Sequence, residues 1–469
     1  MNTSDHDITD NYGVIYSSDH TTLKRAPISL NGSYSVAPSV VNIADGAFAG
    51  CKQLKEICLP CGLRNIGECA FFNCSQITSL QLPETLEYVG NYAFALCRLL
   101  NNITFPNSIT DVGFNIFSGC TSIKKITLPA TIKYIDARFF MGCTELEEIE
   151  TLGSFYTENG ILYSADKQTL IFCPPKAISE HFAIPQGVIN IADGAFQYCT
   201  QLTEIVIPAT IENIGNEVWA GCTNLKKFST EPDGLFQNID DMLTTADGTL
   251  MRCPPATEHT HININSAIKQ IADGAFDNCK KITDVDFGNV LLTLPKNIFA
   301  NCTALQHVTL PQFIETIGER AFLNCKSLSE IKLPNTITSI GKYCFTGCQA
   351  LTTIVIPDDV TELAESTFAD CSSLSFIDLP DTLIRIGQEC FSYCSALQLI
   401  DMPQNIQTID GGAFAYSALQ TIVLPNSIKH VGAEAFANCN QLTSIVIPKH
   451  LEITDSVIDQ SENVTITTK

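Results

Sequence analysis

The sequence predicts a β-rich repeat solenoid built of 23-residue coils, with β-hairpins inserted among them. Three observations predict this fold: an aromatic residue recurs every 23 residues, a cysteine follows nearly every one of them by three positions, and an apolar segment ending in proline recurs with the same period. A unit of this size cannot bury its own leucine, isoleucine and phenylalanine side chains. Stacked copies can bury them in continuous columns, so the repeat predicts one extended array.

The aromatic position defines the register of the repeat. The spacing is 23 residues throughout three runs, apart from a last step of 22, and two longer gaps separate the runs. Fifteen copies are in register, with the single tryptophan in a phenylalanine position: Phe48, Phe71, Phe94, Phe117, Phe140, Phe196, Trp219, Phe276, Phe299, Phe322, Phe345, Phe368, Phe391, Phe414 and Phe436.

Each copy contains three short segments, complete in Leu328–Cys348. The first, L-x-x-I-x-L-P, predicts a short strand, which its proline ends because proline has no N–H to donate to a ladder. The second, x-x-I-x-x-I-G, predicts a shorter extended segment followed by a glycine turn. The third, x-x-A-F-x-x-C, is too short for a regular helix and predicts one 3₁₀ or α turn.

Fourteen of the 21 cysteines occupy this one repeated position: Cys51, Cys74, Cys97, Cys120, Cys143, Cys199, Cys222, Cys279, Cys302, Cys325, Cys348, Cys371, Cys394 and Cys439. Three interpretations compete. A metal or redox site needs paired ligands, and Cys58 and Cys61 form the only C-x-x-C. A disulfide framework suits smaller secreted domains. The spacing favours the third, a small buried apolar residue at a tight turn, and Cys344 and Cys390 stand where other copies carry alanine.

The two gaps hold one extra unit plus ten or eleven residues, and their text is itself repeated. Residues 159–175 and 240–255, like residues 12–27, each show two apolar runs around an aspartate turn, which predicts a β-hairpin. The chain therefore divides into three modules of one continuous solenoid, and each module begins with a hairpin. The predicted segments are an N-terminal cap with a hairpin (1–36), a first run of repeats (37–152), a hairpin plus second run (153–231), a hairpin plus third run (232–448) and a C-terminal cap (449–469).

The pattern is that of a leucine-rich repeat. The periodic A-F-x-x-C and the strand-ending I-P or L-P resemble the BspA-like, or Treponema-type, family of leucine-rich repeats over about residues 36–448. The resemblance implies a cell-surface or secreted protein that adheres to host proteins, extracellular matrix or other cells. The alternative is an intracellular scaffold or adaptor with the same fold.

Composition and motifs restrict the function. The chain of 469 residues carries a formal charge of −23, which argues against a nucleic-acid partner. No stretch is long and apolar enough to predict membrane insertion, and no signal peptide is predicted at the N-terminus, which taken alone favours a cytoplasmic protein. No catalytic motif is present, so we expect no enzymatic activity and no cofactor. His259 and His261 could bind a metal at two points but lack a third ligand.

Outward positions of the first segment are mostly polar, with one local departure. Val355, Phe376, Leu399 and Val423 fall on four successive copies and predict a patch that binds a protein partner or a second copy of the chain. The other interpretation is β-propensity on an exposed strand. A second candidate is an acidic surface that would attract a basic partner; its residues are Glu147, Glu148, Glu150, Asp284 and Asp286.

Overall fold

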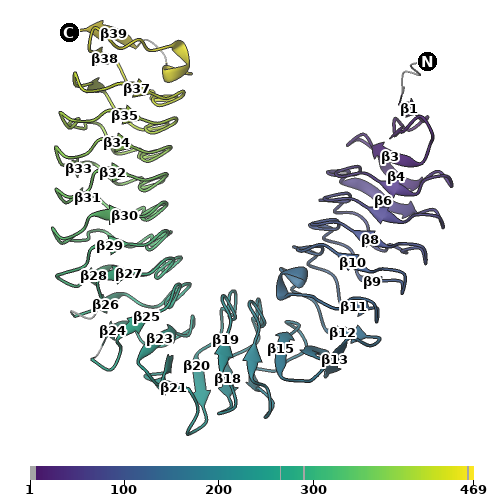
Figure 1. The fold of residues 1–469 in the computed structure, drawn as a ribbon. Helices are drawn as coiled ribbons and strands as arrows, with labels where there is room; N and C mark the ends of the chain where they lie inside the picture. Colours follow the sequence, from purple (N-terminus) through teal and green to yellow (C-terminus); the bar gives the residue numbers. More distant parts are fainter. Residues whose placement is uncertain (1–6, 265, 289–290, 462–463) are drawn as a thin grey trace. The chain divides into compact units, whose positions relative to one another are not determined.

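The fold was analysed in a computed structural model, which describes residues 7–264, 266–288, 291–461 and 464–469 (Figure 1). The chain forms two compact units. Unit 1 comprises residues up to 225 together with 230–235, and unit 2 comprises 226–229 with 236–469. The predicted caps (1–36 and 449–469) and third run (232–448) each include positions outside the described residues. β20 (Lys227–Thr230) lies where the two units divide.

Each coil of unit 1 contributes two strand positions, and neighbouring coils pair in parallel, as the solenoid predicts. We call the surface formed by the L-x-x-I-x-L-P segments the wide face; its strands are β4 (Asn31–Ser35), β6 (Gln53–Cys58), β9 (Asn102–Thr104), β11 (Lys125–Leu128), β12 (Glu148–Thr151), β16 (His181–Ala183) and β18 (Glu204–Ile207). The I-x-x-I-G segments form the narrow face, with β5 (Asn42–Ile43), β7 (Asn65–Ile66), β8 (Tyr88–Val89), β10 (Asp111–Val112), β17 (Asn190–Ile191) and β19 (Asn213–Ile214).

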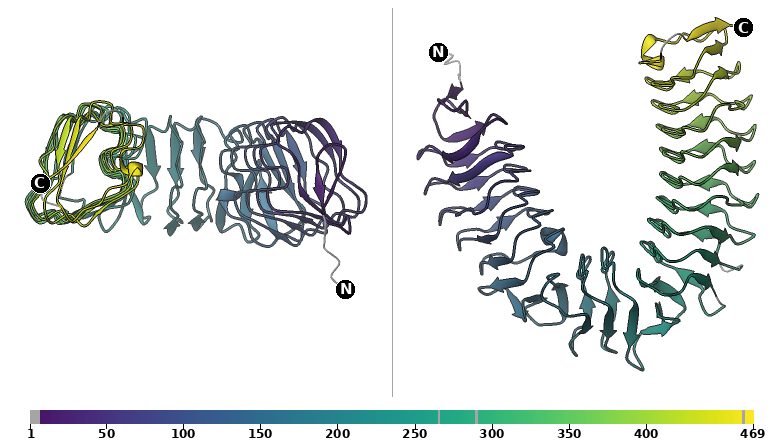
Figure 2. Two further views of the ribbon diagram at one scale, coloured as in Figure 1. Left: turned by 90° about the horizontal axis from the view of Figure 1, so that it is seen from above. Right: turned by 180° about the vertical axis from the view of Figure 1, so that it is seen from behind.

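Unit 2 repeats this plan, and in Figure 2 (left), where unit 2 is seen along its stack, the outlines of its coils nearly coincide. Its wide face holds β24 (His261–Asn263), β26 (Asp284–Asp286), β28 (His307–Thr309), β31 (Thr353–Val355), β33 (Phe376–Asp378), β36 (Thr421–Val423), β38 (Ser444–Ile447) and β39 (Thr465–Thr468). Its narrow face holds β25 (Gln270–Ile271), β27 (Thr293–Leu294), β29 (Thr316–Ile317), β30 (Ser339–Ile340), β32 (Glu362–Leu363), β34 (Arg385–Ile386), β35 (Thr408–Ile409) and β37 (His430–Val431).

The three predicted hairpins are present, and each is extended by a third antiparallel strand that the sequence did not reveal. The resulting meanders are β1 (Ile8–Thr9), β2 (Ile15–Tyr16) and β3 (Thr22–Arg25); β13 (Phe155–Glu158), β14 (Ile161–Ser164) and β15 (Thr169–Phe172); and β21 (Phe236–Ile239), β22 (Met242–Thr245) and β23 (Thr249–Arg252). The last strand of each meander pairs in parallel with a narrow-face strand, so the meander starts that ladder.

The A-F-x-x-C segment is a hydrogen-bonded turn, as predicted: the N–H of the cysteine donates to the carbonyl of the phenylalanine three residues earlier, at 3.0 Å in Cys348. In the described residues the turn extends to a 3₁₀ helix at two places, η1 (Ala137–Phe140) and η2 (Asp455–Ile458). The phenylalanines stack as a buried column. Seven consecutive pairs from Phe276 to Phe436 have ring centroids 5.2–5.5 Å apart.

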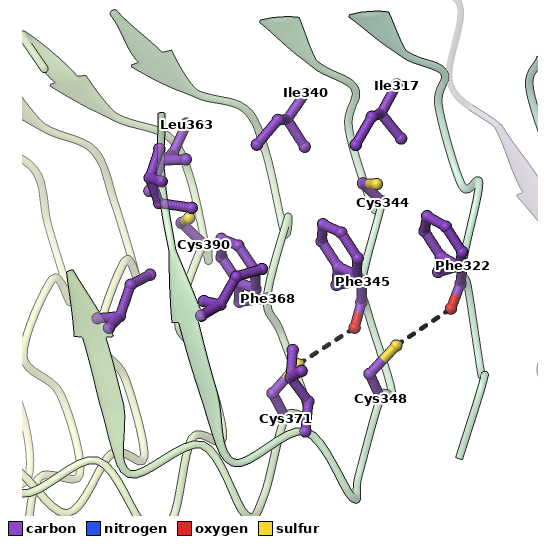
Figure 3. Packing of buried hydrophobic residues seen from close by; sticks show 14 of the residues in the cluster. Ile317, Phe322, Ile340, Cys344, Phe345, Cys348, Leu363, Phe368, Cys371 and Cys390 are labelled. Carbon is purple, nitrogen blue, oxygen red and sulfur yellow. Dashed lines mark hydrogen bonds between the residues drawn. The ribbon is translucent and has the colours of Figure 1, made fainter. Parts of the chain in front are cut away.

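The repeated cysteine has a specific contact beyond filling space. Its thiol donates to the carbonyl oxygen of the phenylalanine in the preceding coil, as Cys348 does to Phe322 and Cys371 to Phe345 (Figure 3). Eleven cysteines make this contact, at 2.9–3.4 Å. A thiol is a weak donor that is also small and apolar, so it fits this buried carbonyl. All fourteen are buried, and no cysteine is in a disulfide.

The glycine that ends each I-x-x-I-G segment sets the approach of neighbouring coils. Its N–H donates to a carbonyl of the coil before it, at 2.9 Å from Gly341 to Ile317. A Cβ at Gly341 would lie 2.5 Å from the backbone nitrogen of Glu319. Wherever such a glycine follows a narrow-face strand, that strand pairs with the narrow-face strand of the preceding coil. Seven copies carry another residue at this position. The ladder is interrupted at three of these, Asp136, Pro295 and Ala364, and continuous at the other four, Ala44, Ala192, Ala272 and Asp410.

Candidate interaction surfaces

The four residues of the predicted patch lie on the wide face of unit 2 and are exposed. The exposed fractions are 59% for Val355, 55% for Phe376, 63% for Leu399 and 53% for Val423. Their outward direction follows from strand geometry, because side chains alternate between the two faces of a strand. The isoleucine next to each one is buried in the core; these are Ile354, Ile377, Ile400 and Ile422. We call the four exposed residues the 355–423 patch.

The 355–423 patch occupies two columns of the face instead of one. Phe376 is in register with Thr353, whereas Val355 is in register with Asp378. By the 23-residue repeat, Leu399 continues the column of Phe376. Parallel neighbours lie about 4.8 Å apart, so the Phe376 and Leu399 side chains form the adjacent apolar pair at the centre. Val355 and Val423 lie diagonally beyond it, one column across.

Two exposed carboxylates accompany the apolar pair. Asp378 follows Phe376 by two residues on β33, and Asp401 has the same relation to Leu399, so each projects from the same face as its apolar neighbour. The patch is therefore an apolar centre bordered by negative charge. Apolar side chains surrounded by polar ones are the usual anatomy of a protein interface.

The acidic candidate is partly neutralised. In unit 1, Glu147 pairs with Lys124 at 3.0 Å, and Lys125 pairs with both Glu148, at 3.3 Å, and Glu150, at 2.5 Å. Three carboxylates thus face two ammonium groups, which leaves one uncompensated negative charge among these five side chains. Asp284 and Asp286 lie on β26 in unit 2 and form no common surface with them within either unit.

The two histidines of the metal candidate pair with different carboxylates. The strand β24 begins at His261, so His259 lies outside it and the two rings do not share a strand face. His259 is 3.3 Å from Asp241, in the turn between β21 and β22, and His261 is 3.0 Å from Asp284 on the next coil. Within the described ranges, no three histidine, cysteine, aspartate or glutamate side chains gather as a possible metal site.

Three cysteines outside the repeated position are not buried. Cys58, at the end of β6, and Cys61 are exposed, and Cys69 is half-buried. Burial raises the pKa of Cys51 to about 11, and that of the more deeply buried repeated thiols higher still. The buried thiols are therefore poor nucleophiles, because the thiolate is the reactive form.

In the part of the chain that the structure describes, no helix reaches the length and apolarity of a membrane span.

Parallel two-strand coils around a column of stacked apolar side chains define a leucine-rich-repeat protein. The chain belongs to the family described as the BspA type leucine rich repeat region, whose model matches residues 32–161, 175–242, 255–375 and 362–468. The resemblance drawn from A-F-x-x-C is thereby confirmed.

Solved structures similar to this chain include bacterial leucine-rich-repeat proteins. A leucine rich cell surface protein from Faecalibacterium prausnitzii is 25% identical, with 81% of this chain and 93% of that chain covered and a TM-score of 0.48. The pneumococcal vaccine antigen PcpA is 19% identical, with 71% and 93% covered and a TM-score of 0.48. A leucine-rich repeat protein from Bacteroides ovatus is 22% identical, with 100% and 99% covered and a TM-score of 0.34. No curated protein matches the chain.

Proposed function

We propose that this chain is a non-catalytic protein-binding protein that acts at a cell surface or in the extracellular space, in adhesion to host or matrix proteins or to other cells. Membership of the BspA-type family supports the surface role. The competing role, an intracellular scaffold, uses the same fold and the same binding face.

The observation that carries the proposal is the 355–423 patch. Phe376 and Leu399 project more than half of their surface into solvent on a face whose other outward residues are mostly polar. Aromatic and aliphatic residues grouped in this way mark interaction sites, and aromatic residues carry a disproportionate share of interface energy. Asp378 and Asp401 favour a partner that surrounds an apolar side chain with basic residues.

The test is a comparison of captured partners. The folded chain and the variant Phe376→Ser/Leu399→Ser are immobilised and exposed to extracellular matrix and host cell-surface proteins. The control is Thr353→Ser/Thr421→Ser, which alters the flanking exposed positions of the same column. We expect a partner retained by the wild type and the control and lost by the patch variant. Equal retention of the partner by the wild type, the control and the patch variant would show that the patch does not bind it.

Location separates the two roles. Antibody or protease applied to intact cells reaches the protein if it works at the surface. Protection until the cells are lysed would favour the scaffold and contradict adhesion.

A further inference from the structure

One coil of unit 1 departs from the repeat at two packing positions. In the copy that contains Phe140, Asp136 stands where glycine normally ends the I-x-x-I-G segment, and Phe139 stands where most copies carry a small residue. A Cβ at the glycine one coil earlier, Gly113, would lie 2.4 Å from the backbone nitrogen of Asn91. A residue larger than glycine is therefore crowded at that position, although the ladder stays continuous at Ala44 and Asp410.

The narrow-face ladder is interrupted at this coil. β10 is the last strand of its sheet, and residues 134–135 form no strand. The chain instead makes η1, whose first turn is capped by Asp136 through an N–H from Arg138 at 3.0 Å. Phe139 is buried against Phe117, with ring centroids 5.3 Å apart. The two departures from the repeat thus coincide with a break in the narrow-face ladder, while the wide-face ladder continues from β11 to β12.

Beside this break lies a crevice of about 340 Å³ bordered by exposed aromatic rings. Tyr88, Phe114 and Tyr134 line it, with 36%, 47% and 77% of their surfaces exposed. Tyr88 and Tyr134 occupy one column of the repeat, and Phe114 occupies another. In the other copies both columns hold mostly polar residues, such as Asn65 and Asn213 in the tyrosine column. Three aromatic departures from the repeat therefore gather beside the break in the narrow-face ladder of the described part of unit 1.

The crevice is also negatively charged. Asp111 lines it, is in register with Tyr88, and makes no ion pair among the described side chains. Asp136 and Arg138, also in the lining, neutralise each other at 2.7 Å. The pKa of Tyr88 is raised, first by burial and then by the carboxylates of Asp111, Asp45 and Glu68, which reports a negative potential at the ring.

We propose that this crevice binds a basic segment of a protein partner by placing an arginine or lysine side chain against the rings of Tyr88, Phe114 and Tyr134, beside Asp111. A cation held over an aromatic face is attracted by the ring quadrupole, and a nearby carboxylate adds to that attraction. The same fold already uses such contacts internally. Lys167 lies 3.7 Å from the ring centroid of Tyr156, and Arg320 lies 5.0 Å from that of Tyr343.

The surface is separate from the 355–423 patch, so the two can be tested independently. The probe is a fluorescently labelled 12-residue glycine/serine peptide with three arginines, measured by anisotropy in low salt. Its comparison peptide replaces arginine with citrulline, which keeps the shape and removes the charge. We expect the full chain to bind the arginine peptide at least tenfold more tightly than the citrulline peptide.

Variants then locate the binding. Asp111→Asn/Tyr134→Thr should weaken it about tenfold, whereas Tyr134→Phe, which keeps the ring, should retain it. The matched control is Asp286→Asn/Tyr393→Thr, which removes the same charge and an exposed tyrosine from unit 2. The proposal is overturned if the control variant weakens binding as much as the site variant, if the site variant leaves binding unchanged, or if the citrulline peptide binds equally well. Loss of binding in Tyr134→Phe would likewise overturn the assignment to the aromatic face.

Discussion

Replacement of Gly341 by alanine should uncouple two neighbouring coils. The added Cβ would lie 2.5 Å from the backbone nitrogen of Glu319 and 2.7 Å from the carbonyl carbon of Gly318. These are backbone atoms, so no side chain can rotate away. To reach an ordinary separation of about 3.4 Å, the coils must part by about 0.9 Å at this corner.

That separation has two costs. The 2.9 Å hydrogen bond from Gly341 to Ile317 would lengthen beyond the useful range, which costs about 1 kcal/mol. Strain and lost contacts in the core add about 1–3 kcal/mol. We therefore expect Gly341→Ala to lower the free energy of unfolding of this region by about 2–4 kcal/mol.

The assay is amide hydrogen exchange, because a repeat array opens locally and a single unfolding midpoint can hide the effect. Protection should fall in peptides that cover β29 and β30. The control is Gly62→Ala, since a Cβ at Gly62 meets no atom within 4 Å. A change of less than 0.5 kcal/mol for Gly341→Ala, or an equal change for Gly62→Ala, would refute the reasoning about close approach.

Two further predictions concern thiols and acid. A thiol reagent applied to the native protein should label Cys58 and Cys61 rapidly and Cys69 more slowly. It should label the 18 buried cysteines only on unfolding. Rapid labelling of most of the 21 cysteines in the native protein would disprove the hydrogen-bonded cysteine column. Asp19 accepts hydrogen bonds from Ser17 and Thr21 in the β2–β3 turn, which lower its pKa to about 2. Because the folded pKa lies below the unfolded value near 3.9, this turn is fully stabilised above about pH 4 and loses that stabilisation as the pH falls through about 2. NMR titration of the Asp19 carboxyl measures the midpoint, and an ordinary value near 3.9 would contradict the turn geometry.

The repeat architecture was predictable because its causes are periodic. One 23-residue pattern specifies strand, turn, aromatic column and cysteine column in every copy, and each copy confirms the others. The additional strand at the start of each meander was missed because apolar and polar residues alternate only weakly in segments such as Phe236–Ile239. Such a segment is a strand because it pairs with the hairpin that follows it.

The sites were less predictable because they depend on departures from the pattern. The exposure of Phe376 and Leu399 followed from strand alternation, whereas the pairing of His259 with Asp241 depends on where the inserted β21–β22 hairpin lies. The crevice beside Tyr134 was missed, although the sequence holds its signal. Asp136 in a glycine position and Phe139 in an alanine position mark the coil where the narrow-face ladder is interrupted.

The most direct test of the central claim is the affinity of the 355–423 patch for its captured partner. Full burial of a phenylalanine or leucine side chain contributes about 1.5–3 kcal/mol, so covering the exposed 55% of Phe376 and 63% of Leu399 contributes about 1.8–3.5 kcal/mol together. The Kd measured by calorimetry should therefore rise about 20- to 400-fold in Phe376→Ser/Leu399→Ser, with the free energy of unfolding changed by less than about 0.5 kcal/mol. A Kd within twofold of the wild type would contradict the account.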